Sequence, residues 1–131
     1  MRKFNRIIID IISHDKQRYE TVGDYFVDPN GDLHIYVSDF KDVRFSYLIG
    51  IHELIESLNT EYNGVMEEKI TEFDEEFESK RVEGNVDEPG DDPLAPYEKE
   101  HCIATSVERL MAAELEVKWK EYEEACNKLH K

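Results

Sequence analysis

Residues 46–58 read SYLIGIHELIESL and form the centre of a predicted amphipathic helix that spans residues 43–60. Apolar residues recur at positions 48, 51, 55 and 58, which is the spacing of one helix face. His52 and Glu56 fall within this apolar face and lie one above the other. Burying an imidazole and a carboxylate without partners is costly, and a bound metal ion would satisfy both groups. Glu53 would then point toward the side of the site where water could bind.

The length and the charge of the chain limit what it can be. Its 131 residues, of which 40% are hydrophobic, predict a single domain over residues 1–131 with one core. The net charge is -15, from 31 acidic and 16 basic residues, which argues against direct nucleic-acid binding through phosphates. Basic or cationic partners suit this charge better than acidic ones.

The cysteines and the N-terminal segment predict a soluble, cytoplasmic protein. Cys102 and Cys126 form no CxxC pattern, so we interpret them as reduced thiols. The apolar run from Ile7 to Ile12 is too short for a signal peptide and is interrupted by Asp10. No stretch approaches the roughly 18 apolar residues that cross a bilayer, so no membrane partner is expected.

Residues 1–38 predict a short antiparallel β-sheet that contains a hairpin. Residues 4–12 are dense in β-branched side chains, which is typical of a strand covered on both faces. Residues 19–27 form a second predicted strand, and residues 28–31 (DPNG) a turn. The alternation of Leu33, Ile35 and Val37 with polar neighbours then predicts a half-buried strand.

Residues 39–131 predict three to four helices, so the expected fold class is α+β. Asp39 or Asp42 can cap the helix over residues 43–60. A second helix has an apolar stripe and an acidic outer side, and residues 82–96 form a long loop rich in glycine and proline. Pro96 opens a third helix, and a fourth begins at about Lys118. The predicted buried stripes are Met66, Ile70, Phe73 and Phe77 in the second helix, Ile103, Val107, Leu110 and Met111 in the third, and Trp119, Tyr122, Cys126 and Leu129 in the fourth.

Residues 52–56 read HELIE, and residues 98–105 in the third predicted helix read EKEHCIAT. Together with the order of strands and helices, these two motifs resemble those of the zincin-like metallopeptidases, especially the small ones related to the ImmA/IrrE peptidases. In those families the first motif is HExxH, and a third ligand comes from a later Glu-x-x-Ala-Asp motif. Here Glu56 stands in place of the second histidine, and His101 stands in place of the glutamate.

The two departures from the family pattern can compensate for each other. With His52, Glu56 and His101 as ligands, the set is still two imidazoles and one carboxylate, as in many catalytic zinc sites. The resemblance implies Zn²⁺ as the metal, Glu53 as the general base and a protein or peptide as the substrate. The chain is also similar to small phage and prophage proteins that carry HELxE and a later DDPxAPYxxEH stretch, a similarity that runs from residue 48 onward and implies no activity.

Other interpretations of the same residues remain open. His52 can be a core histidine hydrogen-bonded to Glu56, and Glu56 can pair with Arg109 or Arg44. Three further carboxylates of the third helix are alternate ligands. Glu100 lies within the apolar stripe, or simply favours the positive end of the dipole at the helix N-terminus. Glu108 lies at the edge of the stripe together with His101. Glu98 forms a Glu-x-x-His spacing with His101, which is typical of two-metal sites in helical bundles.

A different function class follows from the acidic segment at residues 67–92. It holds twelve acidic residues against Lys69, Lys80 and Arg81. Such a surface can mimic DNA toward a DNA-binding enzyme through its electric field, without catalysis. A solvated helix face and loop is the simpler interpretation of the same residues.

Overall fold

The computed structural model describes residues 1–129 and has an α+β fold. A small sheet comes first in the chain and the longer helices follow it, which confirms the predicted fold class. The elements are β1 (Ile7–Ile12), the 3-10 turn η1 (His14–Lys16), β2 (Gly23–Val27), β3 (Leu33–Ser38), α1 (Val43–Tyr62), α2 (Glu67–Ser79), the 3-10 turn η2 (Pro89–Asp91), α3 (Glu98–Glu114) and α4 (Trp119–Leu129).

The sheet is mixed, with β3 in the middle and β1 and β2 at its edges. β2 and β3 form the predicted antiparallel hairpin, and its turn places Gly31 at a φ of +82°, which favours glycine. β1 pairs with β3 in parallel, with Ile7 opposite Leu33 and Ile12 opposite Ser38. The predicted antiparallel pairing therefore holds for the hairpin and not for β1, because the chain reverses once between β1 and β2 and again in the hairpin.

The strand β1 is more exposed than its sequence predicts. Ile7, Ile9 and Ile11 are 47%, 46% and 45% exposed, whereas Leu33 and Ile35 of the central strand are almost fully buried. The prediction that β1 is covered on both faces is therefore wrong. An edge strand has a neighbour on one side only, so its apolar side chains are covered less completely.

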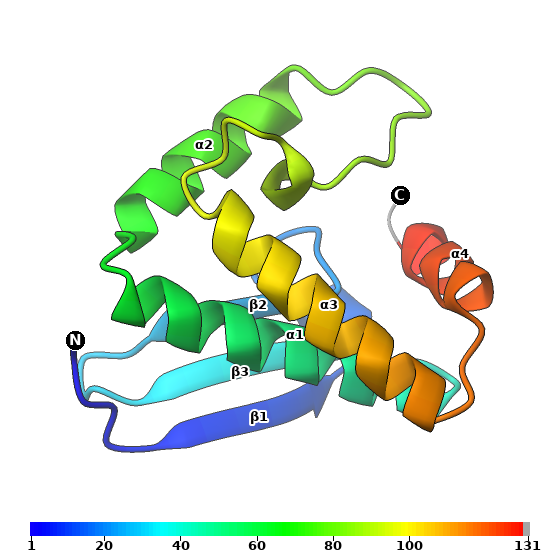
Figure 1. Cartoon of the computed structure of the whole chain (residues 1–131), viewed down its shortest axis with the longest axis horizontal. Helices are drawn as coiled ribbons and strands as arrows, with labels where there is room; N and C mark the ends of the chain where they lie inside the picture. The colour runs from blue at the N-terminus through cyan, green and yellow to red at the C-terminus, as the bar shows by residue number, and fades with distance from the viewer. Residues whose placement is uncertain (130–131) are drawn as a thin grey trace.

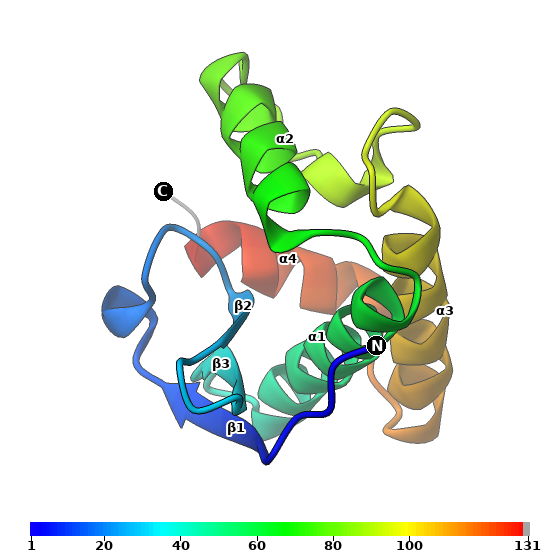
Figure 2. The same cartoon turned by 90° about the vertical axis from the view of Figure 1, so that its left-hand side faces the viewer.

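The helices are stacked on one face of the sheet in layers (Figure 1). α1 lies on the sheet, and α3 crosses α1 on the side away from the strands, as Figure 2 also shows. The helix α4 packs Tyr122 against Phe45 of α1, with ring centroids 5.4 Å apart. The helix α2 projects away from these layers and buries none of its residues. Sites formed between α1 and α3 are therefore interior, whereas the outer side of α2 faces solvent.

The helix α1 follows its prediction closely. Asp42 caps it by accepting a hydrogen bond from the backbone N–H of Arg44, which satisfies one free amide of the first turn. Leu48 and Ile49 are buried against the sheet. His52 and Glu56 are also buried, as their place within the apolar face predicts.

The buried face of α3 differs from the prediction. Ile103 and Leu110 are 40% and 71% exposed, although both belong to the predicted buried stripe. The buried face instead carries two small residues, Ala104 and Ala112, and three polar ones, Glu100, His101 and Glu108. The alanines let α3 approach α1 closely, and the polar side chains find partners there. The most apolar side of α3 therefore does not face α1.

The loop between α2 and α3 contains the turn η2, which packs against the start of α3.

Cys102 and Cys126 are both free thiols, the first exposed and the second half-buried. Among residues 1–129, none of the helices combines the length and the apolar character needed to cross a membrane.

Candidate metal centre

Three residues predicted as ligands meet between α1 and α3. Nε2 of His52 lies 3.0 Å from Oε2 of Glu56, and Nδ1 of His101 lies 2.9 Å from the same oxygen. The two imidazole rings are edge to face, with centroids 4.8 Å apart. All three residues are buried. Segments 45 residues apart in the sequence thus bring two imidazoles and one carboxylate to one interior point.

Further side chains fix the inner residues in place. Nδ1 of His52 donates to Oε1 of Glu108 at 2.8 Å, and the Tyr122 hydroxyl of α4 donates to the other oxygen of Glu108. The Tyr25 hydroxyl of β2 donates to Oε1 of Glu56 at 3.2 Å. His52 and Glu56 therefore each present one polar atom to the centre while their other polar atom is held by a neighbour.

The second nitrogen of His101 faces the turn η2. Nε2 lies 3.0 Å from Oε2 of Glu88 and 3.1 Å from Oδ1 of Asp91, but neither contact has the geometry of a hydrogen bond. The backbone of Gly90 lies against the imidazole ring, since a Cβ there would come within 2.5 Å of it. The turn thus closes over His101 with two carboxylates, and glycine is required for that approach.

The carboxylates make the buried histidines strongly basic. Burial alone would lower the pKa of His52, but hydrogen bonds to Glu108 and Glu56 raise it to about 11. Burial also works against the charged form of His101, while Glu56 and Glu88 raise its pKa to about 10. Burial would raise the pKa of Glu56, yet the two imidazoles hold it well below its usual range. Without a metal, the cluster is a set of imidazolium–carboxylate pairs at neutral pH.

The proposed general base, Glu53, follows His52 on α1 and faces β2. Burial, reinforced by the charge of Glu56, raises the pKa of the Glu53 carboxyl above its usual range. Its Oε1 lies over the backbone of Gly23, where an added Cβ would be only 2.5 Å away. Gly23 is therefore the residue that lets Glu53 fit between the helix and the strand.

Most of these groups line one cleft of about 820 Å³, although Asp91 and Tyr122 are not among its lining residues. Its walls come from β2 and the segment before it, α1, α2, the loop after α2, α3 and α4, and they include His52, Glu53, Glu56, Glu88 and His101. A cleft of this size lies within the usual range for small-ligand sites, about 300–1,000 Å³. The site residues are therefore placed where a bound molecule could reach them.

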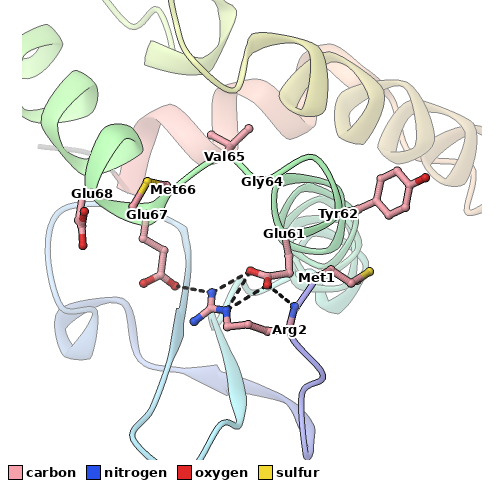
Figure 3. A pocket seen from close by; sticks show the side chains of 9 residues that line it. All are labelled: Met1, Arg2, Glu61, Tyr62, Gly64, Val65, Met66, Glu67 and Glu68. Carbon is pink, nitrogen blue, oxygen red and sulfur yellow. Dashed lines mark hydrogen bonds and ion pairs between the residues drawn. The ribbon is translucent and has the colours of Figure 1, made fainter.

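A second hollow lies where α1 ends and α2 begins (Figure 3). There the Arg2 guanidinium donates hydrogen bonds to both carboxylate oxygens of Glu61 and lies 3.9 Å from Glu67. None of the predicted site residues lines this hollow. Its contacts attach the N-terminal segment to the end of α1.

The alternate ligands on α3 separate into three cases. Glu108 belongs to the cluster, as a partner of His52. Glu100 is buried but accepts a hydrogen bond from Asn63, and Glu98 accepts one from the exposed Cys102. The structure therefore keeps Glu108 near the centre and gives Glu100 and Glu98 other contacts.

The expected arginine partners of Glu56 also have other contacts. Arg44 pairs with Asp42, and the guanidinium of Arg109 stacks over the ring of Trp119 at 4.4 Å. Another cluster of possible metal ligands lies at the hairpin turn and consists of Asp28, Asp32 and His34. These side chains already have protein partners, because Arg6 bonds to Asp32 and His34 bonds to Asp28.

Sequence reasoning missed several residues of the cluster. Tyr25 and Tyr122 look like ordinary core aromatics in the sequence, and only their hydroxyl contacts distinguish them. Glu88 and Asp91 were not recognised because they belong to a long loop within an acidic run. The sequence did contain one signal for them, because the two residues flank Pro89 and Gly90. Proline and glycine favour a tight turn, which could place both carboxylates together.

A scan against family models found no match to this chain, and neither did searches of curated proteins and of solved structures. The residues of the cleft and their geometry are therefore the basis for its function.

Proposed function

We propose that this chain is a zincin-like metal-binding protein and acts as a metal-dependent hydrolase of the peptidase type. His52, Glu56 and His101 would hold a zinc ion, and Glu53 would act as the general base. The observation that carries the proposal is the shared carboxylate oxygen of Glu56, which lies 3.0 Å and 2.9 Å from nitrogens of two histidines.

The spacing of these donor atoms suits a metal ion. Zinc bonds of about 2.0–2.2 Å at tetrahedral angles put neighbouring ligand atoms roughly 3.3–3.6 Å apart. The distances from Oε2 of Glu56 to the two ring nitrogens, 3.0 Å and 2.9 Å, are shorter by a few tenths of an ångström, so the side chains would move apart slightly to admit a zinc ion. Two imidazoles and one carboxylate also match the ligand set of catalytic zinc sites.

The surrounding hydrogen bonds support the same proposal. Ligating histidines commonly donate their other ring N–H to a carboxylate, which fixes the ring and its tautomer. His52 has this arrangement through Nδ1 and Glu108, and Tyr122 holds Glu108 in turn. Glu108 and Tyr122 are therefore positioning residues in the proposed centre.

The residues of the chain can support hydrolysis in the cleft. A bound zinc ion would supply Lewis-acid chemistry that polarises a substrate carbonyl and activates water. Glu53, whose pKa is raised by burial, can take a proton at its carboxylate and return it to a leaving group near neutral pH. The acidic walls of the cleft favour a cationic substrate, and a peptide with basic side chains meets that requirement. A cytoplasmic location fits the two free thiols.

Metal analysis of the protein purified without chelator tests the proposal. We expect close to one zinc per chain, retained by a His14→Ala control and lost in His52→Ala and His101→Ala. Glu53→Gln should keep the zinc and lose peptide hydrolysis, because it removes the base and leaves the ligands. Wild-type protein without zinc, which also fails to bind added zinc, would contradict the proposal.

A second candidate function is an acidic interaction protein that mimics DNA without catalysis. The helix α2 favours it, because its seven acidic residues all lie on an element that buries no side chain. A protein partner with a basic surface would then be the target, and the cluster of His52 would have only a structural role.

A further inference from the structure

The outer nitrogen of His101 is an unusual group in this protein. The side chain is only 7% exposed, and Nε2 has no hydrogen-bond partner in the part of the chain that the structure describes. A buried polar atom of this kind normally finds a partner, because leaving it unsatisfied costs about 1–3 kcal/mol. Two carboxylate oxygens lie close to it, yet neither is placed along the N–H direction.

The positions of these atoms suit a cation better than a proton. Nε2 of His101 is 3.0 Å from Oε2 of Glu88 and 3.1 Å from Oδ1 of Asp91, and the three residues' ligand atoms lie within 4.8 Å of one another. Bonds of about 2.1 Å with octahedral angles place adjacent ligands roughly 3.0 Å apart. We infer that Nε2 of His101, Glu88 and Asp91 form a second divalent-cation site at the mouth of the cleft.

The ligands of this outer site point to a harder cation than zinc. It has two carboxylates and one imidazole, and the carboxylate side chains of Glu88 and Asp91 are 64% and 60% exposed, which leaves room for water ligands. Carboxylate and water ligands suit Mn²⁺ and Mg²⁺. Gly90 holds the site together, because its lack of a side chain lets the turn approach the ring.

The outer site goes beyond the proposed function and does not depend on it. With no inner zinc, Nδ1 of His101 keeps its proton, which it donates to Glu56, and the lone pair of Nε2 binds the outer cation. The Nε2 proton leaves to solvent. With zinc on Nδ1, the outer cation would require loss of the second ring proton as well. Zinc at the inner site should therefore weaken binding at the outer one.

Titration of metal-free protein with Mn²⁺, followed by electron paramagnetic resonance, tests the inference. The variant Glu88→Gln/Asp91→Asn removes two ligands with exposed side chains, so folding should be unaffected. The matched control is Glu83→Gln/Asp87→Asn, which makes the same charge change in the same loop without a contact to His101. We expect the first variant to bind Mn²⁺ at least about tenfold more weakly, since even outer-shell changes cost that much. The control should bind like the wild type.

The variants His52→Ala and His52→Asn separate this inference from the proposed function. Both should lose zinc and keep Mn²⁺ binding, with circular dichroism used to check folding. Mn²⁺ binding that survives Glu88→Gln/Asp91→Asn, or that is weakened equally by the loop control, would overturn the outer site. A wild type that binds no zinc, but binds Mn²⁺ through Asp91, would contradict the proposed function and support the outer site.

Discussion

Two acidic regions of this protein differ in what surrounds their carboxylates. Between α1 and α3, Glu56 and Glu108 are 6% and 7% exposed, and each is hydrogen-bonded to at least one imidazole. On α2, carboxylates such as Glu72 and Glu76 are exposed and form ion pairs with lysines three or four positions away. The first region needs specific partners because its carboxylates are buried, whereas water alone can satisfy the second.

The contrast shows why acidic composition alone indicates little about function. A surface ion pair contributes about 0–1 kcal/mol, so α2 can gain or lose charges with little structural effect. A buried carboxylate constrains every group around it. The interior cluster is therefore where sequence changes should have large and specific effects, and the following predictions test that difference.

The largest effect is expected from Glu56→Ala. This change removes the acceptor that His52 and His101 share and leaves two buried imidazoles without it. Breaking a buried ion pair by removing one partner costs roughly 3–5 kcal/mol. We expect a fall of this size in the free energy of unfolding of metal-free protein, measured by urea denaturation, together with loss of zinc binding.

Glu72→Ala on α2 is the matched control for that measurement. It removes the same side chain from a helix, and its ion pair with Lys69 is exposed. Its midpoint in urea should remain close to that of the wild type. Equal effects of the two changes would mean that the interior cluster contributes no more than the surface.

The second prediction concerns pH, and it uses the same buried groups. His52 has a pKa of about 11 in the folded protein, against about 6.5 in an unfolded chain. The stability that it contributes is present below pH 6.5 or so and is lost as the pH rises toward 11. Metal-free protein should therefore become steadily less stable to unfolding as the pH rises over this interval. The pKa of Glu53 is also raised in the folded protein, so its contribution to stability is likewise lost as the pH rises, over a lower pH range.

Zinc should have the opposite pH dependence, since its binding displaces protons from the histidines. Thermal unfolding from pH 6 to pH 9, with and without zinc, measures both trends. We expect the stabilisation by zinc to grow as the pH rises. A zinc effect that is independent of pH would show that the ion does not replace protons on His52 and His101.

The sequence predicted α1 well because two signals agreed there. Its apolar spacing defined one face, and Asp42 supplied a cap at the expected place. His52 and Glu56 could be recognised as unusual buried polar residues because they interrupted an otherwise apolar face. Here the local pattern and the tertiary packing point in the same direction.

The helix α3 shows the limit of the same reasoning. Leu110 is exposed and His101 is buried, because the packing of α3 on α1 is decided by Ala104, Ala112 and the polar network. Glu88 and Asp91 come close to His101 only through the turn η2. Such contacts depend on segments far apart in the chain, so helical periodicity alone cannot predict them.

The smallest effect is expected on α2, where Glu72, Glu75 and Glu76 can be changed together to glutamine. These residues are exposed, and the structure gives none of them a contact with the interior cluster. Zinc content, thermal midpoint and hydrolysis should therefore match those of the wild type. Binding to a basic protein surface, measured by calorimetry, should weaken because the field of α2 is reduced. Loss of biological activity in this variant with full zinc content would favour the DNA-mimic function over the metal-dependent hydrolase.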